Sequence, residues 1–145
     1  MRHGEAGAVD AKTKTDIQRQ LTLEGRKQIQ NVANKYYSKL SVIDRLWVSP
    51  YVRAQQTAEI IANGINKSII TCSGLTPDGS VSAAIKNLSS QHSQTLLLVS
   101  HQPLVGDLAS SLLGSGLGRF RMDPASIVCI ETDTFTGSIK WLYHS

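Results

Sequence analysis

Apolar side chains recur at helical spacing in the first third of the chain. Between residues 23 and 40 they fall three and four positions apart, which places them on one face of a helix. Thr22 stands directly before this run, and its hydroxyl can cap the first turn. The residues of the apolar face are Ile29, Val32, Ala33, Tyr36, Tyr37 and Leu40. The pattern predicts an amphipathic helix over residues 23–40.

Three short apolar runs have the length and composition of strands. Residues 43–49 are rich in apolar side chains and end at Ser49-Pro50, where a proline stops the strand. Residues 69–72 form a second, shorter run. Residues 95–100 carry four consecutive apolar side chains, as in a parallel strand that is covered on both faces. We therefore predict strands over these three segments.

Helical segments follow each of the three strands. The first is predicted over residues 52–62 and the second over residues 80–88. The third runs from Pro103 to about residue 113, because proline in a first turn loses only a donor that the helix leaves unpaired. Strand and helix therefore alternate through most of the chain.

The C-terminal segment predicts a β-hairpin. Residues 126–131 and 138–143 flank a polar turn that contains Gly137, and we expect this hairpin to finish the sheet. The alternation before it predicts an α/β fold, a single-domain layered α/β/α sandwich with a mostly parallel central sheet. At 145 residues, one domain covering the whole chain is expected.

Composition narrows the class of protein. Hydrophobic residues make up 41% and charged residues 18%, which fits neither a disordered chain nor a membrane protein. No apolar run is long enough to cross a bilayer, and Arg2 directly follows Met1, so we expect a cytoplasmic protein without a membrane segment. Cys72 and Cys129 lack the spacing of a zinc site or redox pair and are expected to be buried, reduced thiols.

The charge balance indicates the kind of partner. A net charge of +4 favours phosphorylated or acidic partners. Because the lysines and arginines are scattered and form no basic run, nucleic acid is not an expected partner.

Candidate chemistry lies at three points where a strand gives way to a helix. Arg2-His3-Gly4 opens the chain, Arg53 follows the first predicted strand, and His101 follows the strand of residues 95–100. Ligands gather at such strand ends, and the amide groups at a helix N-terminus favour an anion. Taken alone, each residue has an ordinary explanation as a loop donor or a solvated side chain. Together, two histidines and two arginines suit phosphoryl transfer, in which one imidazole attacks phosphorus.

These residues stand in motifs that resemble a known family. The motifs are Arg2-His3-Gly4, Ser49-Pro50-Tyr51-Val52-Arg53-Ala54 and Ser100-His101. They resemble the signature of the histidine phosphatase superfamily, which has a phosphoglycerate mutase-like fold. Further blocks resemble the SixA-type phosphohistidine phosphatases within it, and they are Leu21-Thr22-Leu23-Glu24-Gly25, Leu75-Thr76-Pro77 and His101-Gln102-Pro103-Leu104-Val105-Gly106.

The resemblance implies a role for each matching residue. His3 would be the nucleophile, and Arg2, Arg53, His101 and Gln102 would bind the phosphoryl group. The resemblance also implies that the protein uses no metal and no organic cofactor.

Two departures from the family pattern bear on these expectations. Relatives have a short apolar strand before Arg-His-Gly, whereas only Met1 precedes Arg2, so most of the first strand of the domain is expected to be missing. Many members also use an acidic residue in the middle of the chain as proton donor. Here Gly74 precedes Leu75-Thr76-Pro77, the nearest carboxylate is Asp78, and the general acid is unassigned.

The missing acid favours one class of substrate. Imidazole has a conjugate acid with a pKa of about 6.5, so it departs with less help than an alkoxide. We therefore expect a phosphohistidine substrate on a signalling or phosphotransfer protein, such as a histidine phosphotransfer domain, and no segment looks long enough to form a lid over the site. A phosphatase of small phosphate esters, with Asp78 or Glu5 as acid, and a non-catalytic phosphate-binding module are the alternatives. A monomer is the default expectation.

Overall fold

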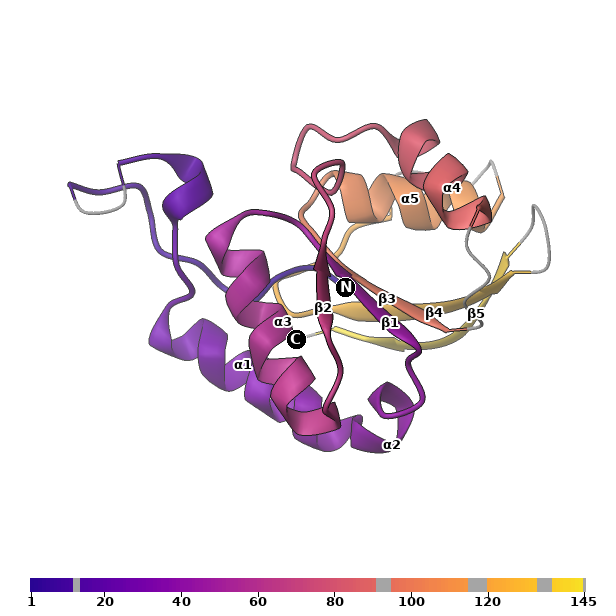
Figure 1. Ribbon diagram of the computed structural model, residues 1–145, viewed down its shortest axis with the longest axis horizontal. Helices are drawn as coiled ribbons and strands as arrows, with labels where there is room; N and C mark the ends of the chain where they lie inside the picture. Colours follow the sequence, from indigo (N-terminus) through magenta and orange to yellow (C-terminus); the bar gives the residue numbers. More distant parts are fainter. Residues whose placement is uncertain (12–13, 91–94, 115–119, 133–136, 145) are drawn as a thin grey trace.

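The computed structural model describes residues 1–145 except 12–13, 91–94, 115–119, 133–136 and 145. Its elements alternate largely as the sequence predicts (Figure 1). They are η1 Asp16–Gln18, α1 Leu23–Lys35, α2 Tyr37–Leu40, β1 Arg45–Val48, α3 Val52–Ile65, β2 Ile69–Thr71, α4 Val81–Ser89, β3 Leu96–Val99, α5 Leu104–Leu112, β4 Ile127–Thr132 and β5 Gly137–Tyr143.

The central sheet is parallel, in the order β2-β1-β3. Leu46 of β1 pairs with Ile69 of β2 on one side and Leu97 of β3 on the other. Helices α1 and α3 lie on one face of the sheet and α4 and α5 on the opposite face (Figure 1). The predicted α/β/α layering with a parallel central sheet is therefore confirmed.

Successive side chains of β1 pack into two separate hydrophobic clusters, one on each face of the sheet. Leu46 and Val48 of β1 join the cluster that α1 and α3 cover. Trp47, between them, joins Leu104 of α5 and the partly buried residues of α4 in a second cluster. This division follows from the two-residue period of a strand, which sends neighbouring side chains to opposite faces.

The first residues of the chain extend the parallel arrangement beyond β3. Arg2 forms a parallel bridge with Ser100, and the amide of His3 donates to the Ser100 carbonyl at 3.1 Å. On the other side, the Arg2 amide donates to the Ser126 carbonyl at 3.0 Å. The N-terminal segment therefore lies between β3 and the chain that leads into β4.

The C-terminal hairpin is present, but it does not finish the central sheet as we predicted. Strands β4 and β5 pair with each other as a separate antiparallel sheet. The physical reason is that the N-terminal residues occupy the position beside β3. The hairpin meets the central sheet through them, since the Ala125 amide also donates to the His3 carbonyl at 2.9 Å.

The predicted helix over residues 23–40 is two helices. Thr22 caps α1 as expected, accepting from the Gly25 amide at 2.9 Å. The helix ends at Lys35, because Tyr36 takes a non-helical backbone with φ −109° and ψ 20°. The Tyr36 ring stacks on Trp141 of β5 with the centroids 5.3 Å apart. A contact with a distant strand therefore accompanies the break, and helical periodicity alone carries no sign of it.

Two further predictions concern the state of the cysteines and the presence of membrane-spanning helices. Cys72 and Cys129 are free thiols, as predicted, but both are partly exposed and not buried. Partial burial raises the pKa of each thiol. No helix in the described ranges is long and apolar enough to cross a membrane.

Candidate active site

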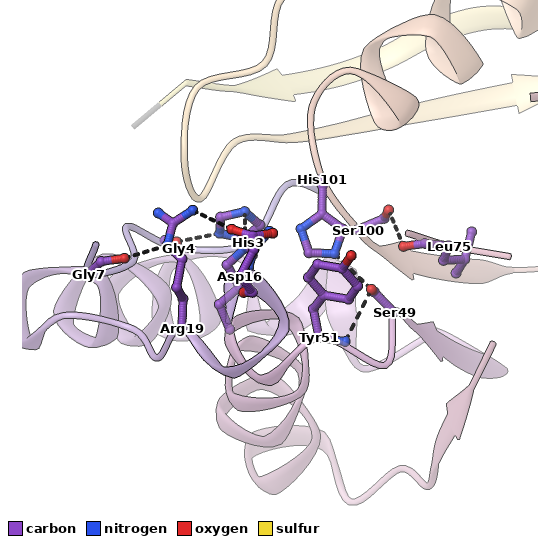
Figure 2. Close-up of polar contacts among 11 residues, drawn as sticks. His3, Gly4, Gly7, Asp16, Arg19, Ser49, Tyr51, Leu75, Ser100 and His101 are labelled. Carbon is purple, nitrogen blue, oxygen red and sulfur yellow. Dashed lines mark hydrogen bonds and ion pairs between the residues drawn. The ribbon is translucent and has the colours of Figure 1, made fainter. Parts of the chain in front are cut away.

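The structure brings the two motif histidines and Arg53 together at the carboxyl end of the parallel strands. His3 follows the N-terminal segment, Arg53 lies in the first turn of α3, and His101 follows β3. The rings of His3 and His101 have centroids 5.0 Å apart (Figure 2). All three side chains are buried, with exposed fractions of 8%, 3% and 1% respectively.

His3 has a hydrogen-bond partner on each ring nitrogen. Its Nδ1 lies 2.6 Å from the Gly4 carbonyl oxygen, which can only accept. Its Nε2 lies 3.1 Å from the Nε of Arg53, which can only donate. Together the two contacts fix the tautomer with hydrogen on Nδ1 and a lone pair on Nε2. A nucleophilic imidazole requires a nitrogen without hydrogen, as Nε2 is here.

The electrostatic surroundings keep His3 neutral. Burial lowers its pKa to about 4, and the positive charges of Arg53, Arg2 and Arg19 add to the effect. Burial also lowers the pKa of His101 well below its usual range, helped by His3 and Arg53. Both rings are therefore uncharged at neutral pH.

Asp16 holds the guanidinium of Arg53. The backbone carbonyl of Asp16 accepts from Nη1 at 2.7 Å, and its carboxylate accepts from Nη2 at 3.0 Å. Arg19 binds the other oxygen of the same carboxylate at 2.8 Å. These arginines lower the pKa of Asp16. The free protein therefore has a carboxylate on the guanidinium group that the sequence analysis assigns to phosphate.

His101 has one paired and one unpaired ring nitrogen. Its Nε2 lies 2.7 Å from the Ser49 hydroxyl, at the end of β1. Its Nδ1 is buried and has no partner in the described part of the chain. The ring of Tyr51 lies against His101 on one side, with centroids 4.9 Å apart.

Arg2 and Gln102 each donate one hydrogen bond to a backbone carbonyl outside this group. Arg2 Nη1 donates to the Met122 carbonyl at 2.8 Å, and its buried Nε has no partner among the described residues. The Gln102 amide donates to the Phe120 carbonyl at 3.2 Å, while its oxygen is buried and unpaired in the part described. The Arg2 charge still lowers the pKa of both histidines.

None of the carboxylates weighed from the sequence contacts the histidines in the described structure. Glu5 accepts from the Thr22 hydroxyl at 2.7 Å and so helps to start α1. Asp78 is exposed. Sequence reasoning missed Asp16, which sits in a polar segment without periodicity, and it also gave no role to Ser49. The Ser-Pro-x-x-Arg motif contains Ser49 and could have pointed to it.

Close backbone packing around residues 4 and 5 fixes the position of His3. A side chain at Gly25 would place its Cβ 2.1 Å from the Glu5 carbonyl oxygen, so only glycine lets α1 approach this segment. The Gly4 amide donates to Thr57 at 3.2 Å, and the Thr57 hydroxyl donates back to the Arg53 carbonyl at 2.8 Å. Helices α1 and α3 thus hold the segment around His3 from two directions.

A cavity elsewhere in the molecule is separate from this site. It measures about 140 Å³ and lies between α4 and the sheet. Trp47, Cys72, Leu75, Leu88 and Leu98 are among its lining residues, and none of the predicted site residues lines it. Among the described residues, no three histidine, cysteine or acidic side chains are grouped as metal ligands would be.

The fold and the site define a class of protein, an α/β domain with a histidine–arginine centre at the carboxyl end of its parallel strands. The sequence model of the histidine phosphatase superfamily (branch 1) matches residues 1–76. The chain belongs to this superfamily, and the resemblance stated from the motifs is confirmed.

Two relatives and one solved structure are similar to this chain over most of its length. Phosphohistidine phosphatase SixA of Escherichia coli (strain K12) is 38% identical over 147 residues, which cover 97% of this chain and 89% of that protein. The SixA homolog of Haemophilus influenzae (strain ATCC 51907 / DSM 11121 / KW20 / Rd) is 36% identical over 126 residues, covering 79% of this chain and 75% of that one. A solved structure of the protein histidine phosphatase SixA complexed with tungstate has a TM-score of 0.89 at 29% identity, covering 99% of this chain and 94% of that one.

Proposed function

We propose that this protein removes the phosphoryl group from a phosphohistidine of another protein, through an intermediate phosphorylated on His3. The observation that carries the proposal is the state of His3, a neutral ring with its lone pair on Nε2 and its hydrogen held on Nδ1 by the Gly4 carbonyl. The names and identities of the SixA relatives support the same activity.

In the first step, the Nε2 lone pair of His3 attacks phosphorus and the bond from phosphorus to the substrate nitrogen breaks. The electron pair of that bond stays on the substrate ring. If the second nitrogen of that ring has first taken a proton from solvent, the ring leaves as neutral imidazole. Because the pKa of imidazole is about 6.5, this protonation is accessible near neutral pH and needs no carboxylic acid from the enzyme.

In the second step, water attacks the phosphorus of phosphorylated His3. The bond from phosphorus to Nε2 breaks, its electron pair returns to Nε2, and a proton of the water passes to a phosphate oxygen or to solvent. The hydrogen on Nδ1 stays in its bond to the Gly4 carbonyl throughout. The products are inorganic phosphate and the starting tautomer of His3.

Positive charge and hydrogen-bond donors hold the moving phosphoryl group. Arg53 already touches His3 Nε2, and a phosphoryl oxygen can replace Asp16 on its guanidinium nitrogens. Nε of Arg2 and Nδ1 of His101 are buried without a partner among the described residues, and a bound phosphoryl group would satisfy both. A part for Gln102 stays a prediction.

The partner is expected to present its phosphohistidine on a surface, as a histidine phosphotransfer domain does. This assignment, a place in signal transduction, a cytoplasmic location and a monomeric state stay predictions. The chemistry of the leaving group supports the substrate class, and the relatives' names support it independently.

Phosphate release from a phosphorylated histidine phosphotransfer domain tests the proposal, with EDTA present. We expect rapid release by the unaltered protein and none above background by His3→Ala. The matched control is His144→Ala, since His144 is exposed near the C-terminus and should be dispensable.

Other outcomes would favour the alternatives. Turnover of small phosphate esters much faster than of the phosphorylated domain would identify an ester phosphatase. Tight binding of the phosphorylated domain without release, unchanged in His3→Ala, would identify a binding module.

A further inference from the structure

Ser49 lies fully buried at the end of β1 and makes two contacts through its hydroxyl oxygen. The Tyr51 amide donates to this oxygen at 3.3 Å. His101 Nε2 lies 2.7 Å from it on another side (Figure 2). A serine hydroxyl has one hydrogen to give and two lone pairs to accept with. Because an amide N–H cannot accept, His101 Nε2 is the acceptor available to the hydrogen of Ser49 among the described residues.

This contact decides which nitrogen of His101 carries hydrogen. If Ser49 donates to Nε2, the hydrogen of the neutral ring is on Nδ1. In the opposite tautomer, Nε2–H would donate to Ser49, and the buried hydroxyl hydrogen of Ser49 would have no acceptor in the described structure. That tautomer would leave two buried groups unpaired among the described residues, the Ser49 hydrogen and the Nδ1 lone pair, whereas the first leaves one, the Nδ1 hydrogen. Because each buried unpaired polar group costs free energy, the first arrangement is favoured.

His101 Nδ1 then becomes a buried donor that lacks an acceptor in the described part of the free protein. His3 presents the opposite atom, a bare Nε2, from a ring only 5.0 Å away. The two histidines therefore differ in function because their neighbours differ. Both rings carry hydrogen on Nδ1, but the Gly4 carbonyl engages Nδ1 of His3, whereas the Ser49 hydroxyl engages Nε2 of His101.

We propose that Ser49 is a positioning residue, which holds His101 in the tautomer with hydrogen on Nδ1 so that this N–H donates to an oxygen of the transferring phosphoryl group. The inference rests on the proposed function for the identity of the transferred group. The tautomer itself is a property of the free protein.

Nitrogen-15 NMR of the histidine rings in the substrate-free protein tests the inference. In the unaltered protein we expect a protonated-nitrogen signal at His101 Nδ1 and a bare-nitrogen signal at Nε2. In Ser49→Ala, the hydrogen should move toward Nε2, and Ser49→Thr, which keeps the hydroxyl, should restore the original pattern. Ser100→Ala is the matched control, because this buried serine at the end of β3 donates to the Leu75 carbonyl at 2.8 Å and not to a histidine.

The functional readout is tungstate affinity together with kcat. We expect Ser49→Ala to lower kcat about tenfold, less than the roughly 10²–10³-fold cost of deleting a transition-state donor outright. Adding Ser49→Ala to His101→Ala should cost little more than His101→Ala alone, since Ser49 acts through that ring.

Hydrogen on Nε2 of His101 in the unaltered protein would overturn the inference, and this result needs no variant to fold. An unchanged tautomer in folded Ser49→Ala would overturn it as well. Because both results come from the free protein, they are independent of whether phosphohistidine is the substrate. Slow release from a phosphorylated domain with the expected tautomers would count against the proposed function and leave the role of Ser49 intact.

Discussion

The two imidazoles of the site lie in one buried pocket but have different hydrogen-bond partners. His3 is held by a carbonyl and a guanidinium, and His101 by a hydroxyl. Burial beside arginines lowers the pKa of both rings, which keeps them neutral. At the scale of single residues, the chemistry therefore depends on neighbours as much as on the motif residues themselves.

The lowered pKa of His3 predicts a loss of stability in acid. Between its folded pKa of about 4 and the ordinary value of 6.5, the unfolded chain binds more protons than the folded one. The free energy of unfolding should therefore be unaffected by this group above pH 6.5 and should fall as the pH drops toward 4, by about 3 kcal/mol for His3. Urea unfolding across this range checks the slope. His3→Ala should make it shallower, with the part due to His101 remaining, and His144→Ala should leave it unchanged. Equal slopes in all three proteins would refute the prediction.

Asp16 predicts an effect on anion binding. Its carboxylate occupies the Arg53 guanidinium in the free protein, so an incoming oxyanion must displace it. Because Asp16 is half exposed, the contact is a weak one, and Asp16→Asn should tighten tungstate binding about two- to fivefold. Calorimetric titration measures the change, with Asp78→Asn as control because that carboxylate is exposed. Weaker tungstate binding in Asp16→Asn would mean that Asp16 mainly orients Arg53.

The motif residues could be identified from the sequence, but the residues that hold them in position could not. His3, Arg53 and His101 follow strand ends, and such positions converge in a parallel sheet, so their meeting was predictable. Asp16 contacts Arg53 across 37 residues from a segment with no pattern to place it. A contact of that kind is set by how the chain folds back, and motif spacing does not contain it.

At the scale of elements, the start of α1 packs closely against the segment that follows His3. Gly25→Ala would push a Cβ to 2.1 Å from the Glu5 carbonyl, so one of the two must move. We expect a loss of roughly 1–3 kcal/mol in the free energy of unfolding, with a fall in activity as His3 shifts. Chemical denaturation and phosphate-release assays measure the two effects.

Gly64 is the control for this prediction. It lies in α3, where an added Cβ would meet no described atom within 4 Å apart from its chain neighbours and the backbone of its own helix. Gly64→Ala should therefore raise stability by about 0.5–1 kcal/mol and leave activity unchanged. Equal effects of the two substitutions would show that the approach of α1 to Glu5 is not tight.

Most elements could be predicted from periodicity, and two of the exceptions share a cause. Helix α1 ends where Tyr36 stacks on Trp141, and α3 runs on to Ile65 before Asn66 turns it with a left-handed φ of 53°. The hairpin stands apart because residues 1–3 occupy the place beside β3. The end of α1 and the position of the hairpin are both set by contacts with distant parts of the chain, which local sequence patterns do not contain.

At the scale of the whole molecule, two cores on opposite faces of one sheet hold the strand ends still. The site forms where the ends of β1 and β3 meet the N-terminal segment, and α1 and α3 support it from one side (Figure 1). That the chain is a single domain stays a prediction.

The most direct test of the account is detection of the phosphorylated intermediate. The protein is mixed with a phosphorylated histidine phosphotransfer domain, quenched within one turnover in alkali, which preserves phosphohistidine, and analysed by mass spectrometry of its peptides. The account predicts one added phosphoryl group on His3, transient in time and missing in His3→Ala. Phosphate release at full rate with no phosphoryl group on His3 at any time, or with the group on another residue, would contradict it.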